Sequence, residues 1–136
     1  MPRKRKGRHV TGIFLLDKGK GLSSNKALQQ IKHLFEAEKA GHTGSLDPLA
    51  TGVLPIFFGQ ATKFSRFLLE AEKTYETNIV LGVTTESGDA ETKVLRKRPT
   101  NNLKRDRIES VLKKYLGKTK QIPPMFSALK VDGERL

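Results

Sequence analysis

The chain has 136 residues, of which 36% are hydrophobic and 29% are charged, and its formal net charge is +12. These proportions predict one domain with a modest core, and they exclude a membrane-embedded or wholly disordered protein. The absence of cysteine excludes disulfides, thiolate catalysis and cysteine-based zinc sites. No apolar run is long enough to cross a membrane, and no signal-peptide core follows the basic N-terminus, so we expect a cytoplasmic protein without membrane contact.

The positive charge gathers at the two ends of the chain. Residues 1–8 carry five Lys or Arg and no acid, and residues 93–136 carry thirteen bases against four acids. Residues 9–92, with eight bases and ten acids, are nearly neutral. This one-sided excess favours a polyanionic partner, nucleic acid above all. The alternative is a solubilising surface with a disordered tail.

Apolar periodicity predicts a tail, a strand and a helix at the start of the chain. We expect residues 1–9 to form a mobile basic tail and the apolar run at 11–19 to form a buried strand. Residues 21–35 show helical spacing, with Ser23 or Ser24 as the N-cap. The residues predicted on the inward face of this helix are Ala27, Leu28, Ile31, Leu34 and Phe35.

Two further elements follow the next loop, and a third segment has period two. Residues 53–59 favour a short strand, and residues 61–73 favour a helix. The side chains on the apolar side of that helix are Ala61, Phe64, Phe67, Leu68 and Ala71. The segment 74–83 alternates like a strand. The side chains that share one side of it are Tyr75, Thr77, Ile79, Leu81 and Val83.

The last third of the chain completes a mixed pattern. We expect an acidic loop at 84–92, a helix at 105–117 ending at Gly117, and a strand with a hairpin turn within 121–136. The predicted inward residues of that helix are Ile108, Val111, Leu112, Tyr115 and Leu116. Strands do not alternate strictly with helices, which favours an α+β fold over a doubly wound parallel sheet.

The loop between the first helix and the second strand has an unusual composition. Residues 41–55 read GHTGSLDPLATGVLP. Its glycines, a residue type used at positive φ or close backbone approach, are Gly41, Gly44 and Gly52. Pro48 favours an extended Asp47, so the loop presents one carboxylate among small neighbours. The alternative is a structural Asp-Pro turn in which the carboxylate caps a backbone N–H.

Other kinds of site find little support. The histidines are His9, His33 and His42, so a metal site would need mostly carboxylates, and we expect none. His33 falls on the polar side of a predicted helix. No HExxH, Walker or GxGxxG motif is present, and no nucleophile elbow accompanies a Ser-His-Asp set.

The sequence resembles a known family in four blocks. The stretch GHTGSLDPLATGVLPIFFGQATKF (41–64) is similar to the catalytic motif of the TruB-type tRNA pseudouridine-55 synthases. LLDKGKGLSSN (15–25) resembles the N-terminal motif of that family, with Gly19 where proline is usual. KTYET (73–77) matches the segment that carries the family's active-site tyrosine. IPPMFSALKVDGERL (122–136) resembles a downstream motif, with Phe126 where tyrosine is commoner.

This resemblance implies a reaction and a set of site residues. Asp47 would be the catalytic carboxylate that converts the uridine at position 55, in the tRNA T-loop, to pseudouridine. It would act as nucleophile at C1′ or as base at C2′, without a cofactor. Tyr75 would stack on the extruded base and His42 would lie near the flipped nucleotides. Lys18 and Lys130 would contact the RNA backbone or support the loop, a solvated lysine being the alternative for each.

The resemblance also implies a fold and its extent. Residues 10–136 would form the N-terminal portion of a pseudouridine synthase catalytic domain, with a mixed, mainly antiparallel sheet flanked by helices and no C-terminal RNA-binding domain. We expect the chain to end before this domain is complete, without the arginine that pairs with the aspartate and without the second strand of the last hairpin. It would then be inactive alone, and either prone to aggregation or dependent on a second chain.

Two further expectations concern the partner. The tRNA T-loop and stem would be the substrate of a protein-only enzyme rather than a guide-RNA-dependent one. The competing interpretation is a non-catalytic basic RNA-binding module. Asp47 separates the two, because a pure binder has no need of a carboxylate facing phosphates.

Overall fold

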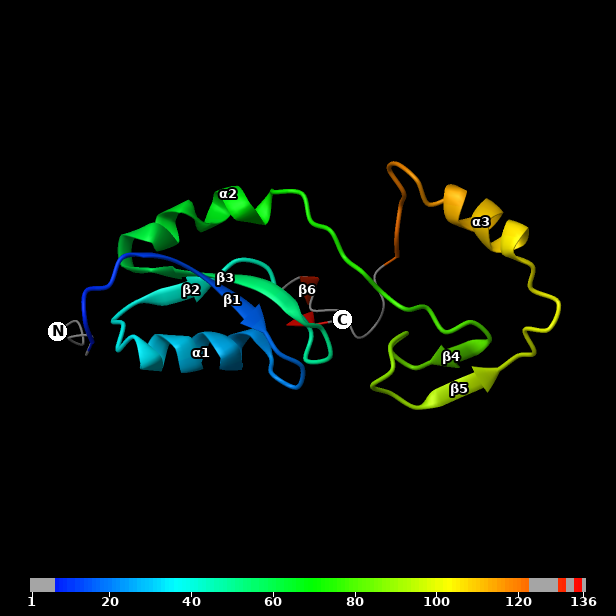
Figure 1. Cartoon of the computed structure of the whole chain (residues 1–136), viewed down its shortest axis with the longest axis horizontal. Coiled ribbons are helices and arrows are strands. Elements are labelled where there is room, and N and C mark those ends of the chain that lie inside the picture. Colours follow the sequence, from blue (N-terminus) through cyan, green and yellow to red (C-terminus); the bar gives the residue numbers. More distant parts are fainter. Residues whose placement is uncertain (1–6, 123–129, 132–133, 136) are drawn as a thin grey trace. The chain divides into compact units, whose positions relative to one another are not determined.

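The structure is a computed structural model that describes residues 7–122, 130–131 and 134–135 (Figure 1). The chain divides into two units, one ending at Tyr75 and one beginning at Glu76. The elements of the first unit are β1 (Gly12–Lys18), α1 (Ser24–Leu34), β2 (Ala40–His42), β3 (Gly52–Phe58), the 3₁₀ helix η1 (Gly59–Phe64) and α2 (Ser65–Leu69). Those of the second unit are β4 (Val83–Thr85), β5 (Val94–Lys97), α3 (Arg105–Lys113), β6 (Lys130–Val131) and β7 (Glu134–Arg135). Every strand pair is antiparallel, which confirms the predicted α+β class.

The first unit is built on a three-stranded sheet in the order β1-β3-β2. The pairs Phe14–Ile56 and Leu16–Leu54 share one face, because directly opposed residues of an antiparallel ladder point the same way. Figure 1 shows α1 on one side of this sheet and η1 with α2 on the other. That second face is only partly covered, because its Ile13, Leu15 and Val53 side chains are exposed.

The core lies between α1 and the sheet. Its buried members are Leu28, Ala37, Ile56 and Phe58, and partly buried apolar side chains surround them. The Phe35 ring packs edge-on against Phe14, with centroids 5.4 Å apart, and 5.1 Å from the Phe58 ring. The period-two pattern of β1 thus meets the helical pattern of α1.

The predicted first strand and first helix are confirmed, with two differences. β1 alternates between half-buried and exposed residues, so Ile13 and Leu15 are exposed rather than buried. Ser23 caps α1, since its Oγ accepts a hydrogen bond from the Lys26 N–H at 3.3 Å. Leu34 was expected on the inward face but is 72% exposed, whereas the next residue, Phe35, packs against the core.

Pro55 lies in the central strand, where a proline is unusual. β2 pairs with β3 only from Ile56 to Phe58, so Pro55 falls just beyond the last β2 partner. Within the described residues, one side of β3 has no partner strand at that point, and a proline without an N–H is tolerated there. The early end of β2 also releases the chain into the glycine-rich loop.

The segment predicted as a helix at 61–73 is shorter and begins as η1. α2 ends at Leu69, and the Lys73 ammonium donates to the carbonyls of Leu69 and Ala71. Phe64 and Phe67 are exposed and stack on each other with ring centroids 6.3 Å apart. The helical spacing was real, but a helix this short depends on packing that these side chains do not receive.

The strand predicted at 74–83 is wrong except at its end. Residues 73–80 have no regular structure, and β4 begins only at Val83. Tyr75 and Ile79 are exposed. An alternating segment becomes a strand only by pairing with a neighbour, and none pairs with 74–82 within residues 7–122.

The first hairpin of the second unit was predicted only as a loop. β4 pairs with β5, which was not expected, and a register shift lies between Thr84 and Thr85. In the connecting loop, hydrogen bonds from the Ser87 hydroxyl and then the Glu91 N–H lower the pKa of Asp89 below its ordinary value.

The last helix and the last hairpin also differ from expectation. α3 ends at Lys113, although Gly117 has the left-handed φ of +81° expected of a helix terminator. Four residues predicted to face inward are exposed instead: Val111, Leu112, Tyr115 and Leu116. β7 pairs with β6 around residues 132–133, so the returning strand that was expected to be missing is present. The Pro-Pro bend and residues 125–126 lie outside the described residues.

The start of the described chain is anchored, although residues 7–9 were expected to belong to a mobile tail. The Arg8 N–H donates to the Glu36 carbonyl at 2.6 Å, and the Glu38 N–H donates to the Arg8 carbonyl at 3.0 Å. His9 Nδ1 lies 3.0 Å from Glu38 Oε2. Among the described helices, none is long and apolar enough to cross a membrane.

Candidate active site

The loop that carries Asp47 leaves the sheet at His42 and rejoins it at Gly52. Its centre is a tight turn in which the Ala50 N–H donates to the Asp47 carbonyl at 3.0 Å. Pro48 occupies the second position of that turn, where its fixed φ is favourable. The backbone on either side of Asp47 is therefore well defined.

The Asp47 side chain is exposed. Within residues 7–122 its carboxylate forms no hydrogen bond and no ion pair. The Asp47 backbone carbonyl closes the turn. Within residues 7–122 the Asp47 carboxylate therefore does not cap a backbone N–H, which was the alternative. No arginine within residues 7–122 pairs with Asp47 either. The carboxylate is available to a ligand.

Two neighbouring segments hold the loop from below. The Ser24 hydroxyl accepts from the Leu46 N–H at 2.8 Å and donates to the Leu46 carbonyl at 3.0 Å. The Gly21 N–H donates to the Pro48 carbonyl at 2.7 Å. The turn after β1 and the first residue of α1 thus hold the residues on either side of Asp47.

Lys18 supports the turn after β1. Its side chain is only 1% exposed, and Nζ donates to the carbonyls of Gly19 at 3.0 Å and Leu22 at 2.8 Å. A buried ammonium needs such acceptors to offset its lost hydration. Lys18 is therefore not a solvated lysine, and its geometry favours loop support over direct RNA contact.

His42 ends β2 and points one ring nitrogen back at the loop. Nδ1 lies 2.7 Å from the Gly44 carbonyl, and because a carbonyl only accepts, Nδ1 carries the proton. In the neutral ring Nε2 is then the acceptor. Gly44 and Gly52 have the positive φ values expected, +69° and +125°. Gly41 does not have a positive φ, because it lies in the extended strand β2. No atom approaches the position that a Cβ would take there, so close approach does not require this glycine either.

Two predicted site residues, Tyr75 and Lys130, have no described contact that tests their roles. Tyr75 is 69% exposed and is the last residue of the first unit, and no hydrogen bond within residues 7–122 joins it to Asp47. Lys130 lies in β6 of the second unit, and its side chain is outside what the structure describes. Ser24 was missed as a site residue. The signal was the pair of adjacent serines, of which a helix cap uses only one.

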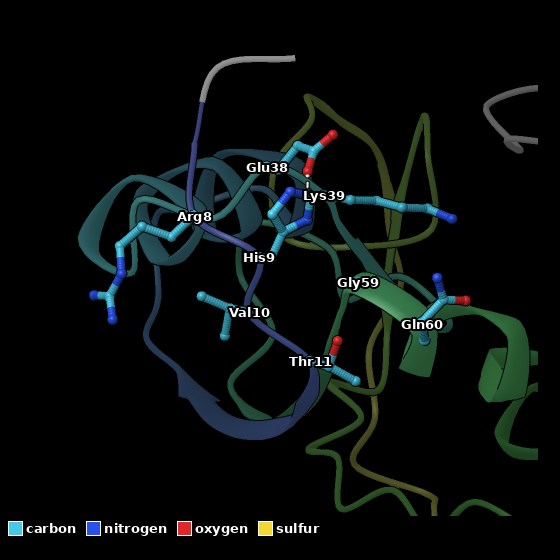
Figure 2. Close-up of a pocket in the computed structure, with 8 residues that line it drawn as sticks. All are labelled: Arg8, His9, Val10, Thr11, Glu38, Lys39, Gly59 and Gln60. Carbon is cyan, nitrogen blue, oxygen red and sulfur yellow. Dashed lines mark ion pairs between the residues drawn. The ribbon is translucent and has the colours of Figure 1, made fainter. Parts of the chain in front are cut away.

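A pocket of about 500 Å³ lies at the opposite end of the sheet, near the start of β1. Figure 2 shows His9 directed at Glu38, while Arg8 and Lys39 point away to opposite sides. A Cβ on Gly59, whose φ is +53°, would collide with the Val10 carbonyl. The backbones of Gly59 and Val10 are therefore in close contact in the wall of this pocket. Its charged groups do not converge on a ligand. No cluster of metal-ligating side chains occurs among the residues placed by the structure.

Comparison with known proteins identifies the family of this chain. The N terminal domain of the TruB family pseudouridylate synthases matches residues 32–136. The chain belongs to the TruB family. Proteins named tRNA pseudouridine synthase B resemble this TruB-family chain: that of Ectopseudomonas mendocina is 61% identical over 133 residues, and that of Chromohalobacter salexigens is 52% identical over 136. These alignments cover 98% and 100% of this chain, but only 43% and 44% of the relatives.

Solved structures support the TruB-type fold. An H/ACA RNP bound to a substrate RNA containing 2′-deoxyuridine superposes with a TM-score of 0.60 at 29% identity, covering 91% of this chain and 35% of that one. A Cbf5-Nop10-Gar1 complex gives a TM-score of 0.59 at 29% identity, covering 88% and 31%. The predicted family and fold class are confirmed.

Proposed function

We propose that the protein converts a uridine of tRNA to pseudouridine, with Asp47 as the catalytic carboxylate. The observation that carries the proposal is the Asp47 carboxylate, which pairs with no group of residues 7–122 and lies on a turn whose backbone is held on both sides. A fixed backbone with an uncommitted side chain suits a group that must meet a substrate atom in one orientation. Membership of the TruB family supplies the reaction class.

The chemistry suits a lone carboxylate. The N1–C1′ bond of the uridine breaks, the uracil turns, and a C5–C1′ bond forms while C5 loses a proton and N1 gains one. The product has the composition of the substrate, so no oxidant, reductant or group donor is needed. A carboxylate assists at the ribose as nucleophile at C1′ or as base at C2′.

The target is proposed to be uridine 55 in the T-loop. A uridine in a folded RNA must leave its stack to expose C1′, which costs a few kcal/mol. An exposed aromatic ring is suited to offset that cost by stacking on the base, and Tyr75 has one. The half-buried His42 presents Nε2 away from its own loop carbonyl, as a group that contacts nucleotides would.

The partner is proposed to be the T-loop and stem. The net charge of +12 fits a phosphate backbone, and the near-neutral middle of the chain holds Asp47. A pure RNA-binding module would gain nothing from an unpaired carboxylate at this position. Identities of 52–61% with tRNA pseudouridine synthase B proteins, against 29% with the RNP structures, favour action without a guide RNA.

Further polypeptide is proposed to complete the active unit. The sheet face opposite the core exposes the apolar side chains of Ile13, Leu15 and Val53. A contiguous exposed apolar patch usually marks a surface to which further polypeptide binds. The chain spans about 43% of the length of the curated relatives it matches. Whether the cover comes from the same chain or a second one, the activity proposed is that of the completed unit.

The test uses a chimera in which this chain replaces the matching segment of the 61% identical Ectopseudomonas mendocina relative. The chimera is incubated with a tRNA transcript labelled with tritium at C5 of uridine, and released label is counted. Stoichiometric release from the tRNA is expected, with none from a transcript in which uridine 55 is replaced by cytidine. A chimera that binds tRNA but releases no label would favour the RNA-binding module.

A further inference from the structure

Ser24 makes an unusual pair of hydrogen bonds for a helical serine. Its side chain is buried, with 4% exposure, and its hydroxyl both accepts from and donates to the peptide groups of one residue, Leu46. The two residues are 22 positions apart in sequence. This is therefore a long-range contact that joins the first turn of α1 to the loop.

The neighbouring Ser23 is the N-cap of α1. Ser23 has the extended backbone of an N-cap, with φ −69° and ψ 152°, and its Oγ accepts from the Lys26 N–H. Ser24 is the first residue of α1, so its own hydroxyl is not needed for capping. The Ser23 hydroxyl thus binds within the helix start, whereas the Ser24 hydroxyl binds the loop that carries Asp47.

Ser24 is connected with Asp47 because it binds the residue next to it, Leu46. Leu46 directly precedes Asp47. The Asp47 carbonyl accepts a hydrogen bond from the Ala50 N–H, and the Pro48 carbonyl accepts one from the Gly21 N–H. Three successive residues are thus fixed, and two of the holds are backbone to backbone. Only the hold on Leu46 depends on a side chain.

We propose that Ser24 is a positioning residue for Asp47, fixing the Leu46 peptide and so the direction in which the carboxylate leaves the turn. This inference rests on the proposed catalytic role of Asp47. A hydroxyl is the smallest side-chain group that donates and accepts at once, which the two Leu46 contacts require. Alanine would leave the part-buried N–H and carbonyl of Leu46 without this partner.

The expected kinetic signature is a loss of turnover without a matching loss of binding. A displacement of about 1 Å in a reacting group can cost on the order of 100-fold in rate. In the chimera, Ser24→Ala should lower kcat by roughly 10- to 100-fold and leave KM within about threefold. Hydrogen exchange at the Leu46 N–H should become faster.

Ser23→Ala is the matched control, since it removes a hydroxyl one position away and weakens only the helix start. It should lower the melting temperature yet leave kcat within about twofold and Leu46 exchange unchanged. Ser24→Thr keeps the donor and acceptor and should recover most of the kcat that Ser24→Ala removes. All rates are measured well below the lowest melting temperature of the set.

The outcomes separate this inference from the proposed function. If Asp47→Asn abolishes turnover while Ser24→Ala matches wild type or Ser23→Ala in kcat, the positioning role is wrong and the catalytic carboxylate stands. A Ser24→Ala protein that fails to fold, or loses kcat only in proportion to its unfolded fraction, also overturns it and makes Ser24 a core residue. If Asp47→Asn remains active, the proposed function itself fails.

Discussion

Lys18 ends β1 directly opposite Gly52, the residue at which the Asp47 loop rejoins the sheet. From there the buried Lys18 ammonium binds the carbonyls of Gly19 and Leu22, and the turn between them includes Gly21, which holds Pro48. The buried Lys18 cation thus shapes the turn that contacts the Asp47 loop. The Lys18 and Asp47 charges are linked through backbone rather than through an ion pair.

Replacing that ammonium should cost stability. Lys18→Met keeps the length of the side chain but leaves two carbonyls without their donor, and we expect a loss of about 1–3 kcal/mol in the free energy of unfolding. Denaturant titration of the chimera measures it. Lys20→Met, at an exposed position of the same turn, should stay within about 0.5 kcal/mol. Equal values for the two variants would show that the desolvation of Lys18 cancels its hydrogen bonds.

His42 allows the loop contact and the ring to be tested separately. The amide nitrogen of asparagine can replace Nδ1, so His42→Asn should retain the bond to the Gly44 carbonyl and unfold within about 0.5 kcal/mol of wild type. It lacks the ring, and tRNA affinity should fall by about 1–3 kcal/mol if the imidazole stacks on a nucleotide. Unfolding and filter-binding titrations are compared. Unchanged affinity would limit His42 to shaping the loop.

Tyr75 is predicted to act through its ring. Because the side chain is exposed, Tyr75→Phe and Tyr75→Leu should both leave stability nearly unchanged. Tyr75→Phe should keep most tRNA affinity, whereas Tyr75→Leu should lose about 1–3 kcal/mol of base stacking. Binding and turnover are measured on the same preparations. A phenylalanine variant that binds but never turns over would instead give the hydroxyl a chemical role.

The basic N-terminus is predicted to supply affinity without sequence preference. The anchoring of Arg8 and His9 suggests deleting residues 2–6 alone, which removes four positive charges and leaves the hydrogen bonds to Glu36 and Glu38 in place. The plot of log affinity against log salt should become shallower by about 0.7–0.9 for each phosphate that the shortened protein no longer neutralises. A slope equal to that of the parent protein would make the segment a solubilising appendage.

How far the sequence predicts the structure depends on where the deciding contacts lie. β1 and α1 were predictable because their patterns and the serine cap are local, and the core they form uses those same faces. The segment 74–83 was not, because a strand exists only with a partner strand. The lengths of α2 and α3 failed for a related reason, since helix ends depend on packing as well as spacing.

The site shows the same division. Asp47 was recognisable from Pro48 and the surrounding glycines, whose effects on the backbone are local. The burial of Lys18 and the division of labour between Ser23 and Ser24 were not, because each depends on residues brought close only by folding. Two adjacent serines look alike in a sequence, and only one of them reaches Leu46.

The most direct test of the central claim is the Asp47→Asn variant of the chimera, assayed for both chemistry and binding. The substitution keeps the shape of the side chain and should not disturb the turn, which is closed by the Asp47 backbone carbonyl. We predict no release of label from C5 of uridine, with tRNA affinity within about tenfold, or roughly 1.4 kcal/mol, of the parent. Turnover above about one hundredth of the parent rate, which corresponds to a loss of at most about 2.7 kcal/mol of transition-state stabilisation, would contradict the assignment of Asp47 as the catalytic carboxylate.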